Sequence, residues 1–183
     1  MDQKFAGHTL FQSVPFGNKM LASRLVMAQM TRMFSPNGVP GENVAQYYRK
    51  RAENRIGLII TEGTAINHPA AVMSPDIPRF YGVDALNGWA NVVNEVHQAG
   101  GKIIPQLWHV RAARKAGSEP NIDSPPVSPS GYTLRDVRNE KIYALTKEEV
   151  TEMIDTYAEA ASNARHIGFD GIELHGAHRY LID

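Results

Sequence analysis

The chain has 183 residues, of which 43% are hydrophobic and 21% are charged, as in a single soluble globular domain. Its 19 basic residues balance its 19 acidic ones, so no net charge attracts it to nucleic acid or to an anionic membrane. Cysteine is absent, which excludes disulfides, thiol nucleophiles and cysteine-based metal sites. No apolar stretch approaches the roughly 18 residues of a membrane span, and residues 1–4 lack the layout of a signal peptide. We therefore expect a cytoplasmic protein without a nucleic-acid or membrane partner.

The N-terminal part of the chain predicts a β-hairpin followed by a strand. The hairpin turns at Gly17 and Asn18, a glycine-containing pair of the kind that closes two-residue turns. The strand that follows is expected at residues 24–28.

Three times further along, a helix-like segment ends in glycine and leads into a short apolar strand. A glycine just past a helix supplies the left-handed residue that ends it. Because the strands are continuous apolar runs, we expect them to be buried on both faces, as in a parallel sheet covered by helices. The helices are predicted at residues 42–54, 84–98 and 146–166, and the strands at residues 58–62, 102–107 and 170–174.

The last helix has the clearest start. Thr146 followed by Glu149 forms the pattern of a capping box, and apolar residues then recur at helical spacing. A segment rich in proline, serine and glycine precedes it between residues 112 and 143, a length typical of lids and binding loops.

This order of elements predicts an α/β fold with four parallel strands and three helices after the hairpin. That is half of the parts of an eight-stranded (β/α) barrel. A small, open, doubly wound sheet is the alternative, but the glycine fingerprint of a dinucleotide-binding domain is missing after the first strand. We therefore predict a partial (β/α)8 TIM barrel that forms one domain over residues 1–183.

Polar side chains follow each predicted strand, where barrels of this type place their chemistry. The carboxamide of Gln106 donates and accepts at once, which suits the pyrimidine edge of a flavin. His175 and His178 can present N–H groups to an electron-rich oxygen, and Tyr180 is an uncharged acid near neutral pH. The residues after the strands are Thr31 and Arg32, Glu62 and Thr64, Gln106 and His109, and His175, His178 and Tyr180.

Simpler interpretations exist for the same residues. Gln106 and Trp108 are compatible with packing alone, and Glu62 with an ion pair to an arginine of a neighbouring element. Methionine fills irregular core gaps, and this is the role expected for four residues near the first strand. They are Met20, Met27, Met30 and Met33.

The two histidines near the end of the chain also have the spacing of a metal-binding pair. A metal site needs a third ligand, and we expect Glu173 to point to the opposite face of its strand, so no metal is predicted. A metal-dependent hydrolase that uses His109, His175 and His178 is kept as an outside alternative.

Four segments, in order, resemble successive signatures of the Old Yellow Enzyme family: residues 24–32, 57–64, 106–109 and 171–178. Members of this family are FMN-dependent NAD(P)H oxidoreductases, or ene-reductases, on an eight-stranded (β/α) barrel. The resemblance runs from about residue 10 to residue 183. It implies the N-terminal half of an FMN-binding barrel, truncated after its fourth strand. In the family, the second half supplies an arginine near the flavin and the loops that grip the FMN phosphate.

The resemblance also implies roles by position. His175 and His178 correspond to the pair that holds the oxygen of an activated alkene or of a phenolic ligand. Tyr180 corresponds to the donor of a proton to the α-carbon, while reduced FMN, regenerated by NADH or NADPH, gives hydride to the β-carbon. The residues implied to bind FMN are Ala28, Gln29, Met30, Thr31, Gly63, Gln106 and His175.

Three residues depart from the family pattern. Gln29 stands where proline is usual, and Arg111 and Arg179 stand where glycine is usual. An arginine at either glycine position is expected to crowd the pocket or to bind an anionic substrate.

A half-barrel leaves both outer strands unpaired, so we expect a homodimer or pairing with a complementary half-barrel. Two functions follow from the sequence. The first is an FMN-dependent oxidoreductase that acts once its barrel is complete. The alternative is a catalytically inactive remnant or a self-associating interaction module.

Overall fold

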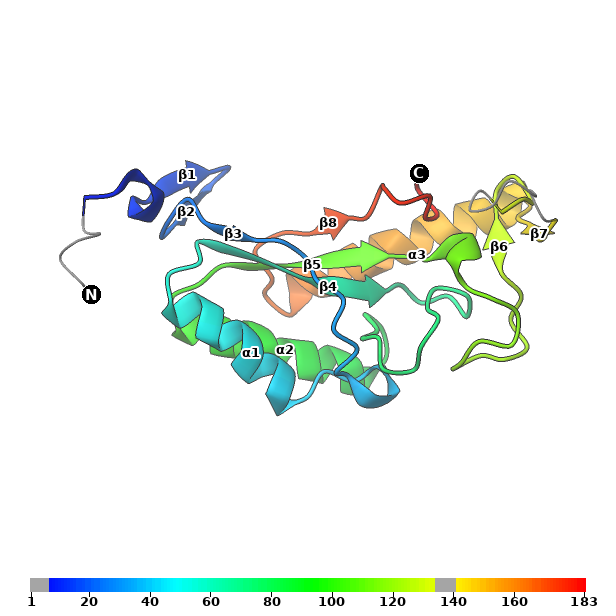
Figure 1. Cartoon of the computed structure of the whole chain (residues 1–183), viewed down its shortest axis with the longest axis horizontal. Helices are drawn as coiled ribbons and strands as arrows, with labels where there is room; N and C mark the ends of the chain where they lie inside the picture. The colour runs from blue at the N-terminus through cyan, green and yellow to red at the C-terminus, as the bar shows by residue number, and fades with distance from the viewer. Residues whose placement is uncertain (1–6, 134–140) are drawn as a thin grey trace.

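A four-stranded parallel sheet forms the centre of the computed structural model, which describes residues 7–133 and 141–183 (Figure 1). Its strands lie in the order β3, β4, β5 and β8, and all three pairings are parallel, as predicted. The strands are β3 (Val26–Met27), β4 (Leu58–Ala65), β5 (Ile103–Trp108) and β8 (Glu173–Leu174).

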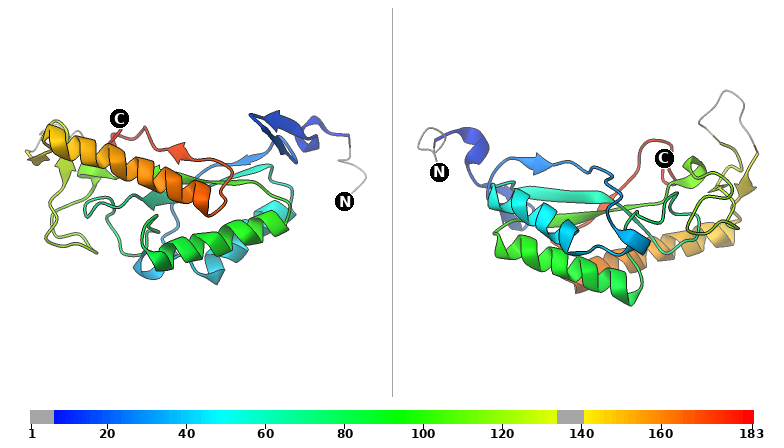
Figure 2. Two further views of the ribbon diagram at one scale, coloured as in Figure 1. Left: turned by 180° about the vertical axis from the view of Figure 1, so that it is seen from behind. Right: turned by 60° about the horizontal axis from the view of Figure 1, so that its bottom comes forward.

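Three helices connect these strands at the predicted places: α1 (Glu42–Glu53), α2 (Val83–Gln98) and α3 (Lys147–His166). Helices α1 and α2 lie side by side along one side of the sheet, and α3 runs along β5 and β8 (Figures 1 and 2). Helix α3 begins with the expected capping box, in which Thr146 Oγ1 accepts from the backbone N–H of Glu149 and the Glu149 carboxylate accepts from that of Thr146.

The predicted hairpin is also present. Strands β1 (Val14–Phe16) and β2 (Lys19–Leu21) are antiparallel, and Gly17 in the turn has a φ of +59°. Glycine adopts this left-handed conformation without the steric cost that other residues incur, which explains why it occupies the turn.

The main core lies between the two central strands and helices α1 and α2. Ile59 of β4, Ile103 of β5 and Tyr48 of α1 are fully buried. An aromatic cluster extends this core, with the rings of Phe80, Trp89 and Phe169 between 5.6 and 6.1 Å apart. Burial of such rings is a large apolar contribution to stability.

The outer strands are more exposed than the sequence predicted. Val26 in β3 and Leu174 in β8 are each about half exposed, because each strand has a neighbour on one side alone within the described residues. The predicted burial on both faces is therefore correct for β4 and β5 and wrong for β8. The core prediction is correct for Met27 of β3 and wrong for Met20, Met30 and Met33, which are exposed in the hairpin and in the loop after β3.

The long segment before α3 contains short ordered elements. After the 3-10 helix η4 (Arg111–Ala113), strand β6 (Val127–Ser128) pairs in parallel with β7 (Tyr143–Ala144). The buried guanidinium of Arg114 donates to backbone carbonyls of Val72, Ser118 and Asn121 and so ties this segment to the loop after β4. Residues 134–140 of the predicted loop, and residues 1–4 with the signal-peptide prediction, lie outside the described residues. Within the described ranges no helix has both the length and the apolarity needed to cross a membrane.

Asp170, just before β8, joins several elements at the N-terminal end of the sheet. Its carboxylate lies 3.3 Å from Lys19 Nζ, 3.2 Å from Lys102 Nζ and 2.8 Å from His97 Nε2, and it accepts from the backbone N–H of Ile103. Burial raises the pKa of Asp170, but the hydrogen bonds from His97, Ile103 and Lys102 outweigh this and hold the pKa below its usual range. The cluster thus connects the hairpin to β5 and β8.

We predict that Asp170→Asn lowers the free energy of unfolding by about 2 kcal/mol, because it removes the charge that Lys19 and Lys102 share and weakens the hydrogen bond to His97. Urea unfolding followed by circular dichroism measures this. Asp155→Asn, an exposed position on α3, is the matched control and should change stability by less than about 0.5 kcal/mol. Equal stability of the two variants would contradict the role given to Asp170.

Candidate active site

Four aromatic side chains gather at the C-terminal ends of β5 and β8. The ring of His175 lies 4.7 Å from that of Tyr180, 5.2 Å from that of His178 and 6.0 Å from that of Trp108. Trp108 and Tyr180 contact edge to face at 5.6 Å. The structure therefore brings the three predicted catalytic residues together, and it adds Trp108, for which no catalytic role was predicted.

Hydrogen bonds set the proton positions in this histidine pair. His175 Nδ1 accepts from the backbone N–H of Ala177, which leaves the proton of the neutral ring on Nε2. His175 Nε2 is 3.3 Å from His178 Nδ1, so it donates to that nitrogen and leaves the proton of His178 on Nε2. Burial, followed by the nearby His178, lowers the pKa of His175, which favours the neutral ring. The pair therefore offers N–H donors rather than a base.

Gly63 of β4 provides the space for Trp108. A Cβ atom at Gly63 would come within 2.4 Å of the indole ring, closer than packed atoms approach. The pairing of β4 with β5 also shifts register between Ile60 and Gly63. The packing of Trp108 thus explains why position 63 is a glycine. Contact of Gly63 with a cofactor stays a prediction.

Gln106 is almost fully buried and is oriented by an acid on the neighbouring strand. Its Nε2 donates to Glu173 Oε1 at 3.3 Å, and the two residues are partners in the register of β5 and β8. Glu173 therefore shares a face with Gln106, and our expectation that it points away from the site is wrong. The physical reason is the period of two in a strand, which puts Glu173 on the same face as residue 175.

The loop after β3 carries the remaining predicted cofactor residues. Glu62 Oε2 accepts from the backbone N–H groups of Arg32 and Met33 at 2.8 and 3.1 Å and so fixes this loop next to β4. Among the described residues Glu62 forms no ion pair with an arginine, although one was expected, and these backbone bonds are its contacts with the loop. Burial raises the pKa of Glu62, while the backbone bonds oppose the rise.

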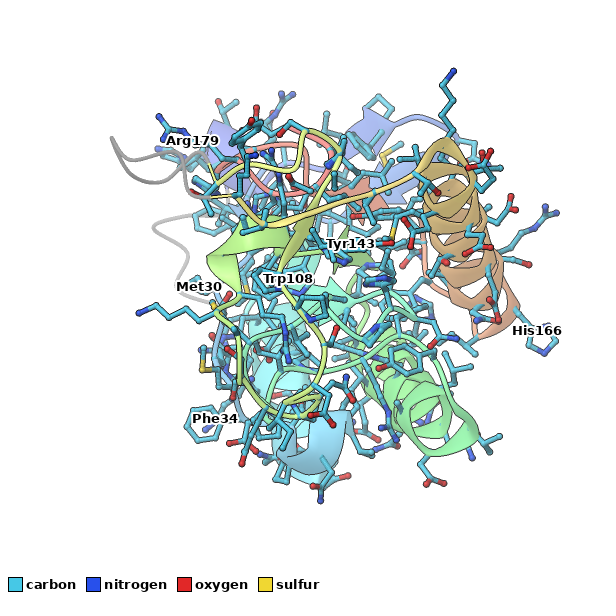
Figure 3. All side chains as sticks on the ribbon, turned by 90° about the vertical axis from the view of Figure 1, so that its right-hand side faces the viewer. Met30, Phe34, Trp108, Tyr143, His166 and Arg179 are labelled. Carbon is cyan, nitrogen blue, oxygen red and sulfur yellow. The ribbon has the colours of Figure 1, made fainter. Side chains whose placement is uncertain are left out.

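This loop lies at the open margin of the sheet. Ala28, Met30 and Thr31 are exposed and Gln29 is half-buried. Figure 3 shows Met30 on the side of the molecule opposite α3, whereas Trp108 is near the middle. One strand, β4, separates the loop from Gln106 in the sheet.

His109 is buried apart from the histidine pair and contacts His68 instead, with Nε2 and Nδ1 2.8 Å apart. His109 Nδ1 accepts from the backbone N–H of Arg111, and His68 Nδ1 accepts from that of Ala70, so both rings are held neutral. Among the described residues, no group of three or more His, Cys, Asp or Glu side chains is arranged to hold a metal ion. The arrangement gives the hydrolase alternative no support.

The two arginines that depart from the family pattern have left-handed backbone conformations. Arg111 has a φ of +51° and Arg179 of +58°, and His178 beside it has +60°. This region costs an L-residue energy that glycine avoids. Arg111 is buried, and its guanidinium donates to Ser130 Oγ, whereas Arg179 is exposed. The backbone at Arg111 and Arg179 therefore has the left-handed conformation that glycine favours, and both arginines are strained there.

Comparison with known proteins decides the ancestry of the chain. A model of the NADH:flavin oxidoreductase / NADH oxidase family matches residues 9–183. The chain belongs to this family. Its flavin oxidoreductase relatives include Old Yellow Enzymes, as the resemblance implied, and the chain spans about half the length of the curated relatives that it matches.

The relatives include both reductases and a protein described as inactive. The chain is 38% identical to 12-oxophytodienoate reductase 7 of Oryza sativa subsp. japonica, over 95% of this chain and 46% of the relative. It is 37% identical to "Probable inactive dehydrogenase easA" of Claviceps purpurea, again over 95% of this chain and 46% of the relative. Family membership alone therefore does not decide activity.

Solved structures of the family contain the same fold. Morphinone reductase in complex with tetrahydroNAD matches with a TM-score of 0.85 and 32% identity, over 94% of this chain and 50% of that chain. The old yellow enzyme homologue of Zymomonas mobilis matches with a TM-score of 0.81 and 32% identity, over 94% and 50%. The four strands and three helices are thus half of a (β/α)8 barrel, which confirms the predicted fold.

We predict that Arg179→Gly raises the free energy of unfolding by about 0.5–1 kcal/mol, because glycine removes the left-handed strain. Urea unfolding measures the change. Arg165→Gly, in the last turn of α3, is the matched control and should lower stability by a similar amount because glycine disfavours helix. A loss of stability in both variants would show that the turn holds no strain.

The buried His109 predicts a dependence of stability on pH. Burial lowers its pKa to about 3, whereas an unfolded histidine titrates near about 6.5, so as the pH falls the unfolded chain takes up the proton first. Its contribution is complete above the unfolded pKa and is lost as the pH falls from there toward the folded pKa. The free energy of unfolding should fall by about 2 kcal/mol between pH 7 and pH 5.

Urea unfolding at a series of pH values measures this slope. His109→Gln should flatten it, whereas His166→Gln, an exposed position at the end of α3, should leave it unchanged. An unaltered slope in His109→Gln would assign the dependence to other groups.

Proposed function

We propose that this chain carries the substrate-polarising half of an FMN-dependent ene-reductase and acts together with a complementary half-barrel. The observation that carries the proposal is the cluster of His175, His178 and Tyr180, in which two N–H donors lie beside a phenol at the C-terminal mouth of the sheet. The substrate class is an activated alkene with a carbonyl or nitro oxygen, and phenols are the corresponding non-reacting ligands.

The groups at this end of the sheet fit an uncharged ring rich in nitrogen and oxygen, such as the isoalloxazine of FMN. The buried amide of Gln106 can both donate and accept. Two buried atoms next to it, Trp108 Nε1 and Glu173 Oε2, have no hydrogen-bond partner within the described ranges, as expected where a polar ligand completes a site. The residues that would hold FMN are Ala28, Gln29, Met30, Thr31, Gly63, Gln106 and His175.

When bound, FMN supplies the hydride chemistry, with NADH or NADPH as the source of electrons. The chain's own residues polarise the substrate. N–H groups of His175 and His178 bind its oxygen, which withdraws electron density from the double bond and makes the β-carbon electrophilic. The hydrogen bond between the two rings, at 3.3 Å, is long enough for a substrate oxygen to replace it at little cost.

Tyr180 would deliver a proton to the α-carbon. Its ring contacts those of both Trp108 and His175, which also contact each other, and the side chain is 8% exposed. An immobilised, neutral phenol is suited to this step because it gives its proton only when negative charge develops on the substrate carbon.

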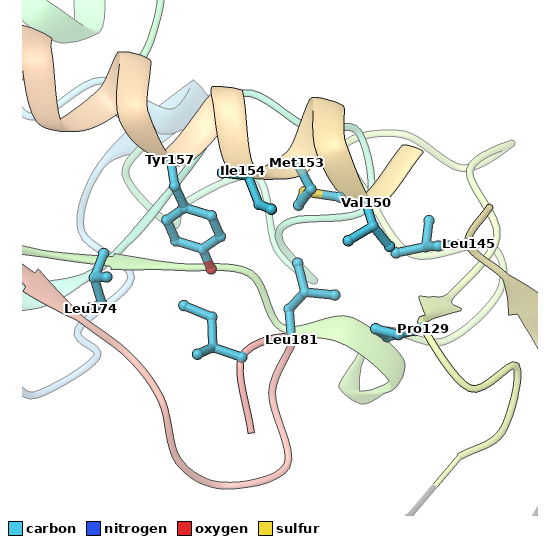
Figure 4. Close-up of a pocket in the computed structure, with 9 residues that line it drawn as sticks. Pro129, Leu145, Val150, Met153, Ile154, Tyr157, Leu174 and Leu181 are labelled. Atoms are coloured by element: carbon cyan, nitrogen blue, oxygen red, sulfur yellow. The ribbon is translucent and has the colours of Figure 1, made fainter. Parts of the chain in front are cut away.

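The partner completes the barrel. An apolar groove of about 280 Å³ lies between α3, β8 and the C-terminal residues, and Figure 4 shows the Tyr157 ring directed into it between Ile154 and Leu174. This groove and the open edges of β3 and β8 favour a second copy or a complementary half-barrel whose strands pair with both edges. The same surfaces also support the second candidate, an inactive half-barrel that associates with itself.

Two variants of a flavin-loaded assembly separate the proposed roles. His175→Ala with His178→Ala should abolish phenol binding, seen as loss of the flavin absorbance change on titration. Tyr180→Phe should retain phenol binding and lower the rate of alkene reduction by about 10²–10⁴-fold, the usual effect of losing a general acid.

Unchanged phenol binding in the double histidine variant would refute the role of the histidines. Unchanged alkene reduction in Tyr180→Phe would refute that of the tyrosine. An assembly that binds flavin but reduces no alkene would favour the inactive candidate.

A further inference from the structure

A second cavity, separate from the candidate active site, lies among three loops. Its volume is about 160 Å³, and its walls come from the 3-10 helix η3 (Pro36–Gly38), from the segment between β4 and α2, and from Pro120. None of the residues given a catalytic or cofactor role above lines it. Because all of its walls belong to the described half-barrel, the cavity does not depend on the open edges of the sheet.

Arg79 is fixed at this cavity by its own backbone. Its N–H donates to Gly38 O at 2.9 Å, and its carbonyl accepts from Trp89 Nε1 at 3.2 Å. The side-chain stem crosses Gly38, where a Cβ atom would come within 3.2 Å of Arg79 Cγ and Cδ. Gly38 has a φ of +74°, so glycine suits both the backbone and the arginine.

The guanidinium of Arg79 lies over the ring of Tyr81, with Cζ 5.6 Å from the ring centroid, and it has hydrogen-bonding capacity left. None of the ion pairs found in the described part of the chain involves it, and its buried Nε has no hydrogen-bond partner there. A buried N–H without a partner is unfavourable, and a guanidinium binds a carboxylate through two parallel hydrogen bonds. The Arg79 side chain can therefore bind an anion in this cavity.

The other walls define the rest of the ligand. Arg79 is the one charged residue lining the cavity, within the part of the chain that the structure describes. Ser74 Oγ accepts from the backbone N–H of Asp76, which leaves its own proton free to donate, and Tyr81 adds a second hydroxyl. Val72 and Ile77 supply an apolar wall. These walls suit an anion with a small apolar body.

We propose that this cavity binds a small organic carboxylate, with the carboxylate on Arg79 and the apolar body against Val72 and Ile77. The volume is below that of the usual pockets for drug-sized molecules, so the ligand is a short-chain or single-ring acid. The site requires neither FMN nor the second half of the barrel.

Titration of the purified chain with benzoate, followed by NMR of methyl groups, tests the proposal. Benzoate should shift the methyl signals of Val72 and Ile77, and benzamide, which has the same ring without the charge, should bind at least tenfold more weakly. Inorganic phosphate, which has the charge without the ring, should also bind more weakly than benzoate.

Variants of Arg79 test whether its positive charge binds the carboxylate. Arg79→Met should weaken benzoate binding at least tenfold, Arg79→Lys should retain part of it, and Arg165→Met, on the remote helix α3, should retain all of it. Since benzoate has an oxygen that His175 and His178 can also bind, the variant that replaces both histidines with alanine should still show the shifts at Val72 and Ile77.

Several results would overturn the proposal. These are the absence of shifts at Val72 and Ile77, equal binding of benzoate and benzamide, and loss of the shifts in the double histidine variant. Phosphate binding as tightly as benzoate would overturn the assignment to a carboxylate. If Arg79→Met does not fold, the comparison of benzoate with benzamide in Arg79→Lys decides, and equal binding of the two there would again refute it.

Discussion

The packing of Trp108 against Gly63 is the constraint on which the candidate site depends. The indole occupies the volume that any side chain at position 63 would need, and it contacts the rings of His175 and Tyr180. One glycine on β4 thus determines where a tryptophan on β5 lies, and that tryptophan determines where residues after β8 lie. Because protein interiors are packed without spare volume, a larger residue at Gly63 would displace the whole cluster.

The elements of this fold could be predicted because their signals are local. Glycines beyond helix ends, the capping box at Thr146 and the continuous apolar strands each depend on neighbouring residues, and they gave the order of a half-barrel. The contacts across the sheet could not be predicted in the same way. The role of Trp108, the exposure of Met30 and the orientation of Glu173 depend on register and on which strands form the edges. The orientation of Glu173 is the exception, because the alternation of side chains along a strand predicts that it shares a face with residue 175.

The resemblance to the family predicted which residues form the site, and the structure describes their geometry and surroundings. It holds His175 neutral and positions Gln106 through Glu173, and it keeps left-handed turns at Arg111 and Arg179. The side chains named in the proposal are therefore held in defined positions in spite of the strain at the two arginines. The chain matches about half of the length of each of these relatives. The chemistry of a complete barrel is therefore proposed for this chain and not shown.

The central claim is that this half-barrel presents a flavin-facing surface and holds flavin only when its two open edges are paired. Native mass spectrometry of the chain with added FMN, alone and with a complementary half-barrel, measures assembly and bound flavin together. The account predicts about one flavin per closed barrel, whether two copies or two different halves form it, and none on the monomer. A monomer with stoichiometric flavin, or a closed barrel without any, would contradict it.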